Sequence, residues 1–295
     1  GVQNTTSASG GDGAFCHIYQ LNSANQFTSY VYNSDYRSTN SGGSFSRIIN
    51  DQNHGSFINP TAYDDASKVL YGDYTNVSTG AGGSFARWLT TGATNTGIAI
   101  SNFNGASVTN IYVSPNVNNR VYFGLANGSV VYVNNATTAI SGVATGTIIK
   151  TGSGSVSGIA IEPGNENHLL VTYSNYGVTS VWESTNGGTS WINDEGNLPD
   201  IPVRWVVFNP TNYDQAMFAT ELGVWSTDNL NGTSTLWAPT NPGLANTRVD
   251  MLKVRASDNT ILAATHGRGL FTTKLNNATL PVVYFENSGV SINEN

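Results

Sequence analysis

Carboxylate side chains in short Gly- and Asn-rich stretches are the residues of this sequence best suited to chemistry. Asp35 lies in NSDY, Asp73 in GDYTN and Glu221 in TELG. Two carboxyl groups can act as acid and base in glycoside hydrolysis, with a separation of about 6.5–9.5 Å for an inverting reaction. A carboxylate pair drawn from these three residues is therefore one alternative for the function.

A second group of side chains suits ligand binding, because tyrosine rings and charged loop residues can hold a sugar ring or a protein. The binding candidates are Asp12, Tyr36, Tyr74, Tyr176, Asp200, His266 and Arg268. Asp200 lies in NLPDIPVRW, and His266 and Arg268 lie in THGRG. The same residues also suit solvated loop tips chosen for turn geometry, and THGRG suits a turn that closes the last repeat.

Metal and cofactor chemistry has little support in the sequence. No His-x-x-x-His or Cys-x-x-Cys spacing is available for zinc. DYTN, NDEGN and ASDNT lack the calcium-loop pattern, and GGDG and GSGSVSG lack the lysine of a phosphate loop. The single cysteine, Cys16, is expected to be a small buried residue on a strand. We therefore predict no metal site and no cofactor.

The charge balance excludes further classes. Only 12 of the 295 residues are Lys or Arg, they form no cluster, and the net charge is −7. Nucleic-acid binding needs concentrated positive charge, so that class is excluded. No apolar run approaches the roughly 20 residues that span a bilayer, so we predict no membrane-spanning segment.

The elements that must position the candidate residues belong to an internal repeat. Val156, Val203 and Val249 each begin an alternating apolar segment, as does Val108, and the four starts are spaced by 48, 47 and 46 residues. Two looser copies precede them, so starts are expected near 13, 56, 108, 156, 203 and 249. Periods in the forties with several short strands each are typical of β-propeller blades. The sequence predicts an all-β propeller of six or seven four-stranded blades over residues 1–275, and it leaves open a first blade that is incomplete.

A polar turn recurs within the repeat. STNSGGSF begins at Ser38, STGAGGSF at Ser78, STNGGTSW at Ser184, and an expanded copy, STDNLNGTSTLW, at Ser226. Ser and Asn or Asp side chains can bond to backbone groups of a turn, and glycine supplies a positive φ. The turns are therefore expected to join the third and fourth strands, with their closing aromatic residues, such as Trp191 and Trp237, buried. On that basis Trp191→Ala should destabilise the fold by about 3–5 kcal/mol.

These turns resemble the Asp-box, or BNR repeat, of sialidases and sortilin-type propellers. The endings VWESTNGGTSW and AATHGRGLFTTKL are similar to the sortilin-like and photosystem-assembly-factor-like propellers of secreted Bacteroidetes proteins. The resemblance implies a secreted or cell-surface protein exported by the type 9 route. It also implies that residues 276–295 are a linker or the first strand of a following module, with further C-terminal domains in the full-length chain.

The leading functional hypothesis is a non-catalytic binding or scaffold module for a protein or glycan partner at the cell surface. Sialidases also need an arginine triad, a Tyr-Glu pair and an Arg-Ile-Pro motif, and the last of these is absent. The alternative remains a glycoside hydrolase that uses two carboxylates at the channel mouth. In a propeller the loops between second and third strands share one face with the blade-to-blade loops, so the candidate residues are expected there.

Overall fold

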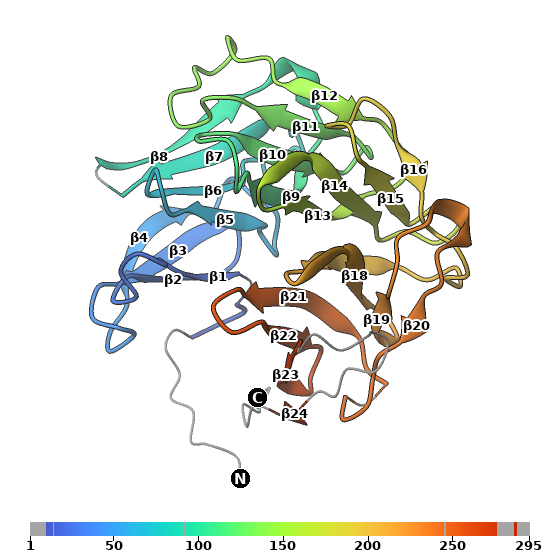
Figure 1. The fold of residues 1–295 in the computed structure, drawn as a ribbon. Coiled ribbons are helices and arrows are strands. Elements are labelled where there is room, and N and C mark those ends of the chain that lie inside the picture. Colours follow the sequence, from blue (N-terminus) through green and yellow to red (C-terminus); the bar gives the residue numbers. More distant parts are fainter. Residues whose placement is uncertain (1–9, 14, 91, 245, 276–285, 288–295) are drawn as a thin grey trace. The chain divides into compact units, whose positions relative to one another are not determined.

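The computed structural model describes residues 10–13, 15–90, 92–244, 246–275 and 286–287. By its contacts the chain divides into two compact units, an N-terminal unit of Thr6–Ser155 and a C-terminal unit of Gly1–Thr5 with Val156–Asn295. Within the described residues each unit holds three four-stranded antiparallel sheets (Figure 1). Two short 3-10 segments, η1 (Ser101–Phe103) and η2 (Gly232–Ser234), are the helical elements of this part of the chain.

In the N-terminal unit the strands of each sheet follow one another in sequence order, or in its reverse. The first sheet consists of β1 (Cys16–Ile18), β2 (Gln26–Ser29), β3 (Asn33–Ser38) and β4 (Ser46–Asp51). The second consists of β5 (Thr61–Asp64), β6 (Val69–Asp73), β7 (Ser84–Leu89) and β8 (Gly92–Ala99). The third consists of β9 (Val108–Val113), β10 (Val121–Leu125), β11 (Val130–Val133) and β12 (Thr147–Lys150).

The C-terminal unit repeats the same order three times. Its first sheet consists of β13 (Val156–Glu162), β14 (Asn165–Tyr173), β15 (Val181–Ser184) and β16 (Ile192–Asn193). Its second consists of β17 (Val203–Asn209), β18 (Asn212–Thr220), β19 (Gly223–Thr227) and β20 (Ala238–Pro239). Its third consists of β21 (Val249–Arg255), β22 (Thr260–Thr265), β23 (Gly269–Lys274) and β24 (Glu286–Asn287).

The predicted repeat is confirmed in its register. Val108, Val156, Val203 and Val249 are the first residues of β9, β13, β17 and β21, and all four are fully buried. The two looser copies begin their first strands at Cys16 and Thr61, three and five residues beyond the expected starts (16 − 13 and 61 − 56). Cys16 itself is exposed on β1, so the expectation of a buried cysteine is wrong.

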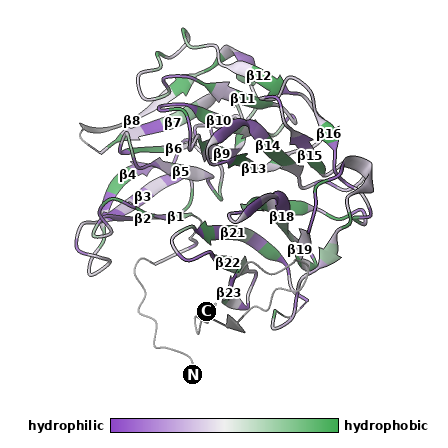
Figure 2. Ribbon diagram, in the orientation of Figure 1, coloured by the Kyte–Doolittle hydropathy of each residue, from purple (hydrophilic) through white to green (hydrophobic). Residues whose placement is uncertain are grey.

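Each unit is held by apolar residues between its sheets. Hydrophobic and hydrophilic residues alternate along β21, the pattern of a half-buried strand (Figure 2). The N-terminal unit has a core that includes stacked Phe85 and Phe123, with ring centroids 4.8 Å apart. In the C-terminal unit the ring centroids of Trp237 and Phe218 lie 3.7 Å apart. The core thus fixes the strands whose ends carry the candidate residues.

Two of the recurrent turns have the same hydrogen bonds in different units. Ser184 Oγ donates to Asn186 Oδ1 at 3.0 Å and accepts from Gly188 N at 2.9 Å, while Asn186 Oδ1 accepts from Ser190 N at 2.9 Å. The Ser38 turn makes the same three bonds. Ser38 Oγ donates to Asn40 Oδ1 at 2.8 Å and accepts from Gly42 N at 2.9 Å, and Asn40 Oδ1 accepts from Ser44 N at 3.0 Å. Both turns join the third and fourth strands of their sheets, as expected.

The Ser78 turn departs from the expectation. It lies between β6 and β7, the second and third strands of its sheet. Gly80 occupies the amide position of the repeat, and Asn76 organises the turn instead by accepting from Ser78 N at 3.1 Å and Thr79 N at 3.0 Å. The prediction that every such turn joins the third and fourth strands is therefore wrong at Ser78.

The closing aromatic residues differ in burial. Trp237 is 2% exposed and donates from Nε1 to the carbonyl of Asp194 at 2.8 Å. Trp191 is only half-buried, so the prediction that both tryptophans are buried holds for Trp237 alone. Trp237 belongs to the apolar core cluster around Phe218, and Trp191 does not.

Within the tail, β24 pairs with β23 as the fourth strand of the last sheet. Residues 276–285 and 288–295 lie outside the described residues. The assignment of 276–295 to a linker or following module therefore remains a prediction.

Candidate functional site

The connection after each second strand lies at the same end of its sheet as the start of the first strand. We call this the loop end. In the C-terminal unit Gly177 N donates to Asp200 Oδ1 at 2.8 Å, which joins the β14–β15 loop to the segment that enters the next sheet. In the last sheet His266 N donates to Arg248 O at 2.9 Å. The expected meeting of these two kinds of loop is thus seen in this unit.

Charged side chains form a connected network at the loop end of the C-terminal unit. Arg204 on β17 pairs with Glu221 in the β18–β19 turn, with Nε 2.8 Å from Oε1. Asp250 on β21 accepts from Arg248 Nε at 2.6 Å and lies 3.4 Å from His266 Nδ1. Arg204 Nε is also 4.0 Å from Asp250, so the two pairs are neighbours. Glu221, a candidate catalytic carboxylate, is therefore neutralised by an arginine.

The most exposed candidates flank this network. Tyr176 is 66% exposed in the β14–β15 loop, and Asp200 is exposed beside it. His266 and Arg268 are exposed in the turn between β22 and β23, where Gly267 has a φ of +74°. Two arginines and a histidine, Arg248, Arg268 and His266, thus come from one sheet's loop end. They can meet an anionic or hydrogen-bonding ligand.

Asp73 is a structural carboxylate within the N-terminal unit. It ends β6, is fully buried, and accepts from Thr75 Oγ1 at 2.8 Å, Ser56 Oγ at 3.0 Å and Val108 N at 3.1 Å. Burial raises the pKa of Asp73, and these donors act against the increase. Its bonds join the end of β6 to the start of β9, so the expected place on an open loop is wrong.

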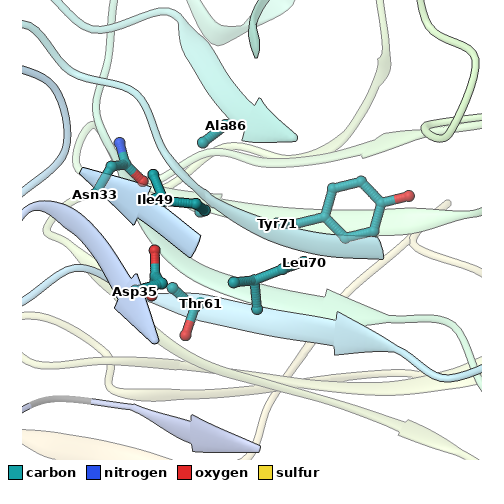
Figure 3. Close-up of a pocket in the computed structure, with 8 residues that line it drawn as sticks. Asn33, Asp35, Ile49, Thr61, Leu70, Tyr71 and Ala86 are labelled. Atoms are coloured by element: carbon teal, nitrogen blue, oxygen red, sulfur yellow. The ribbon is translucent and has the colours of Figure 1, made fainter. Parts of the chain in front are cut away.

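Asp35 lies within β3 rather than on a loop, and only 3% of it is exposed. It lines a narrow pocket with Asn33, Thr61 and Tyr71 among its neighbours (Figure 3). Desolvation raises the pKa of Asp35 to about 7. The raised pKa would suit an acid at neutral pH, but the burial of this carboxyl leaves little room for a substrate.

The two tyrosines nearest these carboxylates are held by the protein itself. Tyr36 lies within β3, and its hydroxyl accepts from Arg47 Nε at 3.1 Å across the strand pair. Tyr74 is stacked on His54, with ring centroids 4.0 Å apart and planes 5° apart. Desolvation and the nearby Asp51 charge raise the pKa of Tyr74. Asp12, by contrast, is exposed ahead of β1.

Sequence reasoning missed an apolar group at the loop end of the N-terminal unit. Phe57 and Ile58 are 51% and 53% exposed in the connection between β4 and β5. The ring of Phe57 meets that of Tyr32 edge to face at 5.8 Å, and Tyr32 has a φ of +58°. A left-handed tyrosine cannot be read from sequence, although the adjacent Phe57 and Ile58 in a polar connection were a visible signal.

A buried group of charges was also missed. Glu162, His168, Glu183 and Asp194 meet in the C-terminal unit, with His168 between two glutamates at 2.7 and 2.8 Å. The residues are far apart in the sequence, but Glu162, His168 and Glu183 lie on three adjacent strands. The available signal was a histidine directly before an apolar run in NENHLLVTY and a glutamate in VWES.

Comparison with known proteins identifies the architecture. No family model and no curated protein matches the chain. An ancestral GH74 enzyme matches with a TM-score of 0.69 and 15% identity over 93% of this chain, which spans only 40% of that enzyme. The WD40 β-propeller domain of Doa1 matches with a TM-score of 0.61 and 11% identity, over 89% of this chain and 79% of that one. The computationally designed Ika8 protein matches with a TM-score of 0.57 and 11% identity, over 89% and 70%.

At such identities the likeness carries the fold and no activity. Together with the six four-stranded sheets, it shows that the chain has the fold of a six-bladed β-propeller. No helix in the described ranges is long and apolar enough to cross a membrane.

Proposed function

We propose that this propeller is a non-catalytic binding module whose loop end in the C-terminal unit receives a protein or glycan partner. One observation carries the proposal: the binding candidates there are exposed, whereas the carboxylates proposed for catalysis are buried or paired. Tyr176, His266 and Arg268 are open to solvent. Asp35 and Asp73 are buried, and Glu221 is bound by Arg204.

The combination of an exposed tyrosine with exposed arginine and histidine side chains, all at the loop end of the C-terminal unit, favours a polar partner. Tyrosine and arginine are enriched among residues that dominate binding energy, since each offers a large contact area with a polar group. Carboxylate-bearing glycans and acidic protein segments both fit this chemistry. The secreted or cell-surface location, the type 9 export route and the Asp-box kinship are part of the same proposal and rest on the sequence resemblance.

The alternative function is a glycoside hydrolase. It is supported by the likeness to a GH74 enzyme and by the pKa of about 7 of Asp35, which is in the range of a general acid. Against it stands the 3% exposure of Asp35, since an acid must reach the bond that it protonates. Hydrolysis of a glycan substrate distinguishes the two functions, because only a glycoside hydrolase would carry it out.

A glycan array run beside a polysaccharide hydrolysis screen tests both. We expect binding without turnover, and a loss of affinity of about tenfold or more for Tyr176→Ala and for the double variant His266→Ala, Arg268→Ala. Arg255→Ala is the matched control, because Arg255 is exposed in the same sheet but at the opposite end, paired with Asp258 at 2.8 Å.

Turnover that disappears in Asp35→Asn or Glu221→Gln, with folding intact, would overturn the binding-module proposal. Silence in both assays would exclude a glycan and direct the search to a protein partner through pull-down with the same variants. The gene sequence on either side of this chain tests the export proposal: it should encode a signal peptide and a sorting domain.

A further inference from the structure

The imidazole of His168 is held between two carboxylates inside the C-terminal unit. Nδ1 lies 2.7 Å from Glu162 Oε2 and Nε2 lies 2.8 Å from Glu183 Oε1, and the His168 side chain is 10% exposed. The carboxylates come from β13 and β15, on either side of the strand that carries His168. From β17 the ring of Phe208 covers the imidazole, with centroids 4.6 Å apart.

Both imidazole nitrogens can donate only when the ring is protonated, so this arrangement fits the cationic form. Burial lowers the pKa of His168, but the two glutamates outweigh it and the net pKa is raised. Glu166, two residues earlier on the same strand, is a further acidic group nearby in sequence.

Asp194 extends this group of charges. It is fully buried, and its Oδ1 accepts from Thr235 Oγ1 at 2.8 Å. Its Oδ2 is buried and has no donor among the described residues. Burial raises the pKa of Asp194 to about 6, and the negative charge of Glu183 adds to the increase. A proton on the Asp194 carboxyl group would remove the repulsion between its charge and that of Glu183.

The segment after Asp194 reaches the loop end. Glu195 and Asp200 accept from Ser180 N and Gly177 N, the second at 2.8 Å, and these amides flank the exposed loop of Tyr176. Burial raises the pKa of Glu195, and the charge of Asp200 adds to the increase.

The same segment is fastened to the neighbouring sheet. The Asp194 carbonyl accepts from Trp237 Nε1 at 2.8 Å, and Asn197 Oδ1 accepts from Trp237 N at 2.6 Å. A Cβ on Gly196 would lie 1.9 Å from the Thr235 carbonyl oxygen, so the two chain segments are in direct contact. Movement of Asp194 must therefore shift this segment or break its bonds.

We propose that Glu162, His168, Glu183 and Asp194 form a proton-dependent clasp that orders the Tyr176 loop when protonated and loosens it as pH rises. When the pH increases, Asp194 loses its proton and becomes negatively charged beside Glu183. His168 then loses its proton, and with it the positive charge that interacts with both Glu162 and Glu183. Each change weakens an interaction that Glu183 makes, with Asp194 or with His168, so the two changes act in one direction. The consequence for binding rests on the proposed function, whereas the change in loop order does not.

Hydrogen exchange at the amides of Gly177 and Ser180, followed between pH 5 and pH 8 and corrected for intrinsic rates, tests the clasp. We expect the protection of these amides to fall by about tenfold or more over that range, since one group can shift an equilibrium up to tenfold per pH unit. In Asp194→Asn the protection should change little with pH below 7, because an amide can still accept from Thr235 and donate to Glu183. Asp214→Asn, at an exposed aspartate on β18, is the matched control and should behave as the wild type.

A protection that does not vary with pH, or that varies equally in Asp194→Asn, would overturn the proposal. NMR titration of the four histidines in the wild-type chain gives an independent answer should Asp194→Asn not fold. The His168 ring, assigned by its disappearance in His168→Gln, should keep its proton above the ordinary range, and an ordinary pKa would overturn the clasp. These readouts involve no ligand, so their failure is distinct from a failure to bind a partner.

Discussion

At the scale of single residues, Asp35 shows that a candidate catalytic carboxylate can lower the free energy of unfolding. Its position on β3, three residues before the Ser38 turn, corresponds to Val181 before the Ser184 turn, which is fully buried. The first sheet of the N-terminal unit therefore has a carboxyl group at the position where the first sheet of the C-terminal unit has a branched apolar side chain. Burial of a charge without a compensating partner is unfavourable, and the carboxyl responds by holding its proton.

Asp35→Asn should make the fold more stable at pH 8 but not at pH 4. Burial raises the pKa of Asp35 to about 7 from an unfolded value near 3.8, so folding favours the protonated form. The stability from this proton is complete below about pH 4 and is lost as pH rises through 7, by up to about 4 kcal/mol at 1.4 kcal/mol per unit. Urea unfolding at pH 4, 6 and 8 measures the difference. Equal pH dependence in variant and wild type would show that Asp35 is not buried as described.

The two closing tryptophans should differ in their effect on stability. Trp237→Ala should cost about 3–5 kcal/mol, because it removes a 2%-exposed ring and leaves the Asp194 carbonyl without its donor. Trp191→Ala should cost less than half of that, because Trp191 is half-buried. Thermal unfolding of both variants compares them directly. Equal losses would mean that Trp191 is more deeply packed than the structure shows.

At the scale of elements, the recurrent turn is a structural hairpin organised by one amide. The Asn186 side chain makes three hydrogen bonds to two serines: it accepts from Ser184 Oγ and Ser190 N, and it donates to Ser190 Oγ at 2.8 Å. Asn186→Ala should therefore destabilise the fold by about 1–2 kcal/mol, with no change in ligand affinity. The exposed Thr185→Ala serves as control, and chemical denaturation of each gives the comparison. A loss of affinity with unchanged stability would give this turn a functional role.

The elements were more predictable from sequence than the site. Alternation of apolar residues and a valine at the start of four of the six first strands indicated the repeat, because burial of one strand face recurs along the chain. The Ser78 turn was misplaced, since its sequence resembles the others but Gly80 removes the amide that organises them. Asp35 and Asp73 were expected on open loops because Gly, Asn and Tyr surround them. Their burial depends on residues distant in the sequence, Thr61 on the neighbouring sheet for Asp35 and Ser56 in the β4–β5 connection for Asp73, and local sequence does not encode such contacts.

At the scale of the whole molecule, buried ionisable groups share one direction of pH dependence. The pKa values of Asp35, Asp73, Asp194 and Glu195 are raised by burial, and that of His168 is raised by its glutamates. Each of these groups binds its proton more tightly in the folded chain than in the unfolded chain. Lys150 acts in the opposite direction, since burial lowers its pKa to about 8. Its effect on stability belongs to a higher pH range than that of the acidic groups.

The free energy of unfolding should consequently be larger near pH 5.5 than near pH 8. Stability falls with pH wherever the folded state binds more protons, and between these values Asp35, Asp194 and His168 all release protons from the folded state. The net charge of −7 also shrinks toward the isoelectric point of about 4.9, which reduces self-repulsion at the lower pH. Urea midpoints at intervals from pH 5.5 to 8 measure the trend, and the double variant Asp35→Asn, Asp194→Asn should flatten most of it. A midpoint that rises with pH would mean that these carboxyls are charged in the folded chain, and the proposed clasp would fall with them.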